Sequence, residues 1–155
     1  MGIAVAIITC STTRKLSEDT AGAALEERIE AQGWTVSMHV VVPDKRDHIS
    51  RAIVDASAVS DIVLTCGGSG LSLEDVTPEA TADVCERNVP GIVEAMRAAS
   101  MEKTRRAMLS RAVCMQRGST LVLNLPGSLK AATECFDAVC DQFEHAVHMT
   151  AGAGH

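Results

Sequence analysis

The feature that most constrains this chain is a series of short, continuous apolar runs separated by segments with helical periodicity. The first run covers residues 3–9 and contains no charged side chain. Strands buried on both faces have such uninterrupted apolar sequences, whereas a strand with one solvated face alternates between apolar and polar residues. Further β-rich runs occupy residues 35–42, 62–65, 113–116 and 120–124. We therefore expect strands in a sheet that is covered on both faces.

The segments between these runs carry signals for helices. Asp44, Thr77 and Ser128 are suitable N-cap residues for three of the expected helices. The last helix is expected to continue from Ser128 to about His148, and residues 100–111 are expected to be irregular or a short helix. Alternating strands and helices predict an α/β domain with a mostly parallel sheet flanked by helices on both faces.

The length and hydrophobicity of the chain suit one domain. It has 155 residues, of which 46% are hydrophobic, which is enough for a substantial core. We find no internal repeat or linker, so we expect a single domain over residues 1–155, with a flexible tail at residues 150–155. No stretch approaches the ~20 apolar residues that a membrane-spanning helix needs, so no membrane partner is expected.

Composition also limits the partners. With 14 basic and 20 acidic side chains, the chain has no basic stripe that could displace counterions from nucleic acid. Aromatic residues make up 2% and tyrosine is absent, which excludes a stacking platform for single strands. The six cysteines form no C-x-x-C pair, and we interpret them as reduced, mostly buried thiols of a cytoplasmic protein.

Three loops follow expected strands, at residues 10–19, 66–75 and 125–130. In α/β sheets of this kind, ligands bind beyond the carboxyl ends of the strands. The second loop contains Gly67-Gly68-Ser69-Gly70, the glycine loop, whose backbone amides can form an anion site. Its spacing matches neither a P-loop nor a dinucleotide-binding turn. From these residues alone, the glycine loop is either a phosphate cradle or a simple turn.

The third loop has the same organisation, because Leu125-Pro126-Gly127-Ser128 leads from a strand into a helix. Free amides at that helix start, with Lys130 in its first turn, would favour an anion. Asp75 follows the glycine loop by five residues, and a carboxylate beside a phosphate site is typical of Mg²⁺ binding. Asp75 is also compatible with a role as a cap or turn residue.

Together these segments resemble the molybdenum-cofactor biosynthesis proteins of the MogA and MoaB type, over roughly residues 3–143. The most specific matches are TCGGSG at 65–70, DVTPEAT at 75–81, AMLSR at 107–111 and NLPGS at 124–128. Shorter matches are the segments 19–22, 42–44 and 90–91.

The resemblance implies a three-layer αβα fold with a mixed central sheet, assembled as a homotrimer or homohexamer. It also implies a molybdopterin adenylyltransferase, in which ATP and molybdopterin give adenylyl-molybdopterin and pyrophosphate with Mg²⁺. A metal-insertion protein would be a transient partner. The residues implied are the glycine loop for the phosphates, Asp44 and Asp75 for catalysis and Mg²⁺, and Ser110, Pro126, Gly127 and Ser128 for further contacts, with Lys130 offsetting negative charge.

The chain also departs from the pattern of the family. Glu74 stands where arginine is common, and Ser11-Thr12-Thr13 replaces a Ser-Asp-Arg-like element. Two alternatives to an active enzyme therefore stay open: a non-catalytic molybdopterin-binding protein of the same fold, and a generic nucleotide-binding regulatory domain. The pair Arg105-Arg106 is compatible either with reaching a phosphate or with facing solvent.

Overall fold

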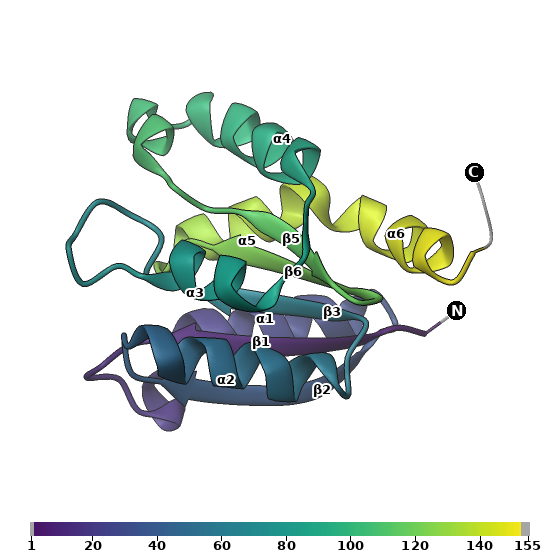
Figure 1. Cartoon of the computed structure of the whole chain (residues 1–155). Helices are drawn as coiled ribbons and strands as arrows, with labels where there is room; N and C mark the ends of the chain where they lie inside the picture. Colours follow the sequence, from purple (N-terminus) through teal and green to yellow (C-terminus); the bar gives the residue numbers. More distant parts are fainter. Residues whose placement is uncertain (1, 153–155) are drawn as a thin grey trace.

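The apolar runs form one six-stranded sheet at the centre of the computed structural model, which describes residues 2–152. Its strand order is β2-β1-β3-β6-β5-β4 (Figure 1). The strands are β1 (Ala4–Cys10), β2 (Thr35–Val42), β3 (Ile62–Cys66), β4 (Arg87–Asn88), β5 (Cys114–Arg117) and β6 (Thr120–Leu125). Strands β2, β1, β3 and β6 run parallel, while β5 and β4 are antiparallel to their neighbours. The predicted mostly parallel sheet is confirmed. The short edge strand β4 was not predicted, because its two exposed polar residues carry no strand pattern.

Helices cover both faces of this sheet (Figure 1). They are α1 (Thr20–Ala31), α2 (Arg46–Ser57), α3 (Thr77–Val84), α4 (Pro90–Met101), α5 (Leu129–Val139) and α6 (Phe143–Thr150), with short 3₁₀ turns η1 (Leu16–Glu18), η2 (Arg105–Leu109) and η3 (Cys140–Gln142). One core cluster lies under α2 and α3, and a larger one lies under α1, α4, α5 and α6. The predicted three-layer α/β architecture is thereby confirmed.

Strand β1 shows why the sheet needs an apolar layer of helices on each face. Val5 and Ile7 point into the larger cluster, whereas Ala6 and Ile8 point into the smaller one, and all four are fully buried. Successive side chains of a strand point to opposite faces, so an unbroken apolar run requires an apolar layer on each side. The uninterrupted run therefore follows from the position of β1 inside the sheet.

The predicted long last helix is wrong in its continuity. Helix α5 ends at Val139, a 3₁₀ turn follows over Cys140–Gln142, and α6 completes the chain through Thr150. The break places Phe143 in the core, where it packs with Trp34 and Phe136 at centroid separations of 5.9 Å. Of the expected tail at 150–155, Thr150 is still helical, and residues 153–155 lie outside the described residues.

Burial also explains the cysteines. The six thiols are free; Cys10, Cys66, Cys114 and Cys135 are buried, and the other two are half-buried. Burial raises the pKa of Cys10, Cys66 and Cys114 to about 12, so these thiols stay protonated near neutral pH. They act as small apolar side chains. Within residues 2–152, no helix combines the length and apolarity required to cross a bilayer.

A buried charged network connects β1, β2 and α1. Asp19 is 3% exposed and accepts hydrogen bonds from the Thr9 hydroxyl at 2.6 Å and the Gly22 amide at 3.0 Å. The Nε2 atom of His39 lies 2.7 Å from the same carboxylate, and its Nδ1 atom lies 3.0 Å from Glu26. A side chain on Gly22 would overlap both Asp19 and His39. Burial alone would raise the pKa of Asp19, but the hydrogen bonds from Thr9, His39 and Gly22 outweigh it and lower that pKa.

We expect Asp19→Asn to lower the free energy of unfolding by about 2 kcal/mol at pH 7, because it removes a charged, buried acceptor. A carboxyl group whose pKa is lowered by folding stabilises the protein above its unfolded pKa, and that stability is lost as pH falls. Urea unfolding of the wild type should therefore show a steeper loss of stability between about pH 5 and pH 3 than unfolding of the variant. Asp55→Asn, at an exposed position of α2, is the matched control. Equal stability of both variants at pH 7 would contradict this role for Asp19.

Candidate ligand-binding site

Three loops meet at the carboxyl edge of the parallel strands, as the sequence predicts. The Gly67 amide donates to the Leu125 carbonyl at 3.0 Å. A Cβ atom on Gly67 would lie 2.9 Å from the carbonyl oxygen of Cys10, and one on Gly127 would lie 3.2 Å from the Cα atom of Gly67. The end of β1 and the loops after β3 and β6 therefore approach one another through their backbones, with no room for side chains between them.

The glycine loop also needs an unusual backbone. Gly67 and Gly68 have φ angles of +99° and +71°, in the left-handed region that side chains disfavour. A Cβ atom on Gly68 would in addition collide with the Thr77 hydroxyl. Two independent constraints thus select glycine at these positions, and the sequence Gly67-Gly68 is required by the turn itself.

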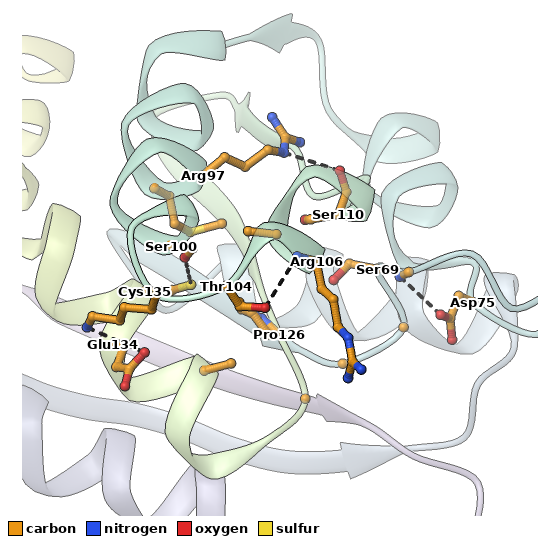
Figure 2. A pocket seen from close by; sticks show the side chains of 18 residues that line it. Ser69, Asp75, Arg97, Ser100, Thr104, Arg106, Ser110, Pro126, Glu134 and Cys135 are labelled. Atoms are coloured by element: carbon orange, nitrogen blue, oxygen red, sulfur yellow. Dashed lines mark hydrogen bonds and ion pairs between the residues drawn. The ribbon is translucent and has the colours of Figure 1, made fainter.

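The loops border a cavity of about 380 Å³ (Figure 2). The glycine loop and the Pro126 turn form one side, and residues of α4, η2 and α5 form the other. Predicted site residues in its lining are Gly67, Gly68, Ser69, Gly70, Asp75, Ser110, Pro126 and Gly127. The cavity thus combines a polar backbone edge with a wall that includes apolar side chains such as Met96 and Ala131.

Three predicted site residues lie outside this lining. Ser128 is the N-cap of α5, as predicted, and accepts a hydrogen bond from the Ala131 amide at 3.3 Å. Lys130 lies in the first turn of α5 without lining the cavity. Asp44 is next to the glycine loop, but also outside the lining.

The predicted capping roles of Asp44 and Thr77 are wrong. Lys45 occupies the N-cap position of α2, and Val76 occupies that of α3, each without a side-chain cap. Helix α3 begins one residue earlier than expected, so Thr77 is its first residue and its side chain is buried beside Gly68. Among the described residues, the Thr77 hydroxyl oxygen has no hydrogen-bond partner.

Two carboxylates flank the glycine loop. Asp75 accepts a hydrogen bond from the Gly70 amide at 3.0 Å. Asp44 accepts from the amide and the hydroxyl of Thr12, at 3.2 and 3.3 Å, through its Oδ2 atom. Its Oδ1 atom lies 3.5 Å from the point where a Gly68 Cβ would be. Because neither acid caps a helix, both keep oxygen atoms on the side of the glycine loop.

This donor set fits Mg²⁺ bound together with a phosphorylated ligand. Mg²⁺ is usually held by one or two carboxylates, substrate phosphates and water, rather than by a complete protein cage. Over residues 2–152, no group of three or more acidic, histidine or cysteine side chains is arranged to hold a metal ion. The oxygens of Asp44 and Thr77 instead both lie beside Gly68, at the position where a side chain on that residue would collide with Thr77.

Arg111 holds the glycine loop from outside the cavity. Its amide donates to the Ser69 carbonyl at 2.8 Å, and its Nε and Nη2 atoms donate to the carbonyls of Gly70 and Asp75 at 2.7 and 2.8 Å. Its Nη1 atom pairs with Glu79 at 2.6 Å, and this hydrogen bond lowers the pKa of Glu79. One guanidinium group thus fixes both ends of the segment from the glycine loop to Asp75.

Apart from Ser110, the α4 and η2 side of the cavity was not predicted from the sequence. Arg97 donates to the carbonyls of Ser110 and Ala112, which fixes η2 against α4. Lys103 pairs with Glu134 at 3.4 Å. The other unpredicted lining residues include Ser100, Thr104, Arg106 and Cys135. The pair Arg105-Arg106 was a further hint in the sequence, and of the two only Arg106 lines the cavity.

Comparison with known proteins connects this site to a family. Residues 6–145 match the family described as "Probable molybdopterin binding domain". The chain belongs to this family. The match includes every loop of the site, so the family assignment and the cavity concern the same part of the chain.

Individual members of the molybdopterin-binding family support the assignment. A molybdopterin adenylyltransferase of Helicobacter pylori strain 26695 is 33% identical over 90% of this chain and 82% of its own length. The molybdenum cofactor synthesis protein cinnamon of Drosophila melanogaster is 37% identical over 95% of this chain, which spans 25% of that protein. The structure of a molybdopterin biosynthesis Mog protein from Mycobacterium ulcerans is 36% identical, covers 98% of this chain and 99% of its own, and superposes with a TM-score of 0.90.

We expect Arg111→Met to loosen the glycine loop, because no single methionine can replace donors to two carbonyls and a carboxylate. Amide hydrogen exchange over residues 67–75 should accelerate at least about tenfold, since each lost hydrogen bond to a charged group is worth roughly 1.5–3 kcal/mol. In Arg111→Lys, which keeps the charge opposite Glu79, the exchange rate should lie between those of the wild type and Arg111→Met. Arg87→Met, at the exposed edge strand, is the control. Unchanged exchange at residues 67–75 would show that the loop holds its shape without Arg111.

Proposed function

We propose that this chain is a molybdopterin adenylyltransferase of molybdenum-cofactor biosynthesis, which converts ATP and molybdopterin to adenylyl-molybdopterin and pyrophosphate. The observation that supports this most is the cavity between the glycine loop and the α4–η2 wall, in a chain of the molybdopterin-binding family. Relatives named for this activity support it further. The backbone edge suits phosphates, and the opposite wall suits the flat body of a pterin or an adenine.

The residues of this site are suited to binding and orienting their ligands. Transfer of a phosphoryl-type group depends mainly on positioning and charge stabilisation, and it does not need a strong base. In the proposed reaction, a phosphate oxygen of molybdopterin attacks the α-phosphate of ATP, and pyrophosphate leaves. The amides of Gly68 and Ser69 would hold these phosphates, because the Gly70 amide already donates to Asp75. Ser110, Pro126 and Gly127 border the same space.

Asp44 and Asp75 are the proposed Mg²⁺ ligands. Two carboxylates next to several phosphates would repel them unless a cation lies between, so the acids fit the site only with a divalent ion. Bound Mg²⁺ would neutralise the charge that develops on the phosphates. The hydrogen bonds from Thr12 and Gly70 would hold the two carboxylates in place.

The direct test is to incubate the purified protein with molybdopterin, ATP and Mg²⁺ and to measure adenylylated pterin and pyrophosphate. Formation of both products supports the proposal. Tight molybdopterin binding without turnover would instead identify a non-catalytic pterin-binding protein, which Glu74 in place of arginine makes a specific alternative. Binding of ATP without molybdopterin would point to a nucleotide-binding regulatory domain.

We predict that Asp44→Asn and Asp75→Asn each slow turnover about 100-fold or more, which corresponds to about 2.7 kcal/mol of lost transition-state stabilisation. Asparagine keeps an acceptor for the donors from Thr12 or Gly70, so the loops should stay folded while the charge is lost. Molybdopterin affinity should change much less, because the missing contact is made mainly in the transition state. Normal turnover of both variants at saturating Mg²⁺ and ATP would contradict the metal assignment. Asp141→Asn, exposed and remote from the glycine loop, is the control.

We also propose that the chain assembles as a homotrimer or homohexamer, with a metal-insertion protein as a transient partner. Large apolar side chains stay exposed on the single chain, which is typical of surfaces that meet another protein. They include Leu71, Leu73, Met108 and Leu109 around the loops of the site, and Leu73 is 99% exposed. We expect light scattering at micromolar concentration to give three or six times the chain mass of 16.3 kDa. A single species of the chain mass would contradict this expectation.

A further inference from the structure

Three cationic side chains line the cavity, and two of them already have partners. The Arg97 guanidinium donates to the backbone carbonyls of Ser110 and Ala112. The Lys103 ammonium pairs with Glu134 at 3.4 Å. These two groups hold α4, η2 and α5 together, so their charges are already used to stabilise the wall of the cavity.

Arg106 is the third cation of the lining, and its guanidinium makes no hydrogen bond or ion pair with any described residue. Only its backbone amide is engaged, by the hydroxyl of Thr104 at 3.3 Å. Figure 2 shows the Arg106 side chain extending from η2 into the space between the Pro126 turn and the loop that carries Ser69 and Asp75. An unpaired guanidinium therefore faces the backbone amides of the glycine loop across the cavity.

This juxtaposition defines the chemistry of a ligand. Both the glycine-loop amides and a guanidinium are hydrogen-bond donors only, so the group between them has to be an acceptor. A guanidinium also has a planar pair of donors that matches phosphate oxygens. Since the chain carries a net charge of −6, a local cation in this cavity strengthens the binding of an anion.

We infer that Arg106 is a further ligand-binding residue, whose guanidinium binds the phosphate group that the glycine loop receives from the opposite side. The inference deepens the proposed function and rests on it, since the phosphate belongs either to molybdopterin or to ATP. Arg106 would thus turn a one-sided backbone cradle into a two-sided site, and would favour phosphorylated ligands over their dephosphorylated forms.

Arg105 provides a closely matched control. It is the preceding residue of the same 3₁₀ turn and is also exposed, but it does not line the cavity. Arg106→Gln and Arg105→Gln therefore remove the same charge from neighbouring positions. A general electrostatic effect would appear in both variants, whereas a phosphate contact would appear in the first alone.

The experiment measures dissociation constants of wild type, Arg106→Gln, Arg105→Gln and Arg106→Lys for pyrophosphate, ATP and molybdopterin by calorimetry. We expect Arg106→Gln to weaken binding about tenfold or more for the ligand whose phosphate lies there, since it removes charged hydrogen bonds to that phosphate. Arg105→Gln should change the dissociation constant for that ligand less than twofold. Arg106→Lys should recover part of the affinity that Arg106→Gln loses. The loss should shrink at high salt, because an exposed charge is screened.

The three ligands separate the sources of the phosphate. A loss confined to molybdopterin places the pterin phosphate at Arg106, and a loss for ATP and pyrophosphate places the nucleotide phosphates there; either result supports the inference. Equal affinities of Arg106→Gln and Arg105→Gln for all three ligands overturn it, even if the wild type is active. Conversely, weaker pyrophosphate binding by Arg106→Gln, in a protein that forms no adenylylated pterin, would retain the inference and reject the proposed function. A wild type that binds none of the ligands would reject both.

Discussion

The close approach of three loop backbones at Gly67 is the constraint on which the rest of the site depends. Cys10 ends β1, while Gly67 and Gly127 belong to the loops after the neighbouring parallel strands β3 and β6, and the three meet at distances that leave no space for a Cβ atom. This contact is possible only because β1, β3 and β6 are buried side by side and end at the same edge. The two apolar layers that cover the sheet therefore also determine where the glycine loop lies.

The charges of the site are organised in two shells around that contact. Arg111 lies outside the cavity and Arg97 lies in its lining, and both direct their donors to carbonyl oxygens, so they set the shape of the cavity. Asp44 and Asp75 lie at the glycine loop itself, and Arg106 faces it from across the cavity. An acidic chain can hold phosphates here because backbone amides carry much of the attraction, and these amides add no net charge.

Much of the fold could be predicted from the sequence, because uninterrupted apolar runs are nearly sufficient to identify the buried strands β1, β3 and β6. The glycine loop could also be located, since its glycines are required locally. The roles of Asp44 and Thr77 as helix caps were predicted incorrectly, because each helix begins one residue away from the expected position and tertiary contacts then decide the side-chain partners. Of the α4 and η2 wall, only the segment 107–111 with Ser110 followed from a motif. The α4 residues become neighbours of the glycine loop only through the packing of α4 on α5.

The two sides of the cavity differ in whether main-chain or side-chain groups face the ligand, and they therefore respond differently to amino-acid substitution. One side consists largely of main-chain amides, which every non-proline residue supplies, so substitutions there can distort the donors but cannot delete them. The other side consists of side chains on α4, η2 and α5, of which Arg97 and Lys103 stabilise the wall, while Arg106 makes no such contact among the described residues. Selectivity among related phosphorylated heterocycles can therefore be redesigned from η2 alone, with the anion-binding half left intact as a fixed platform.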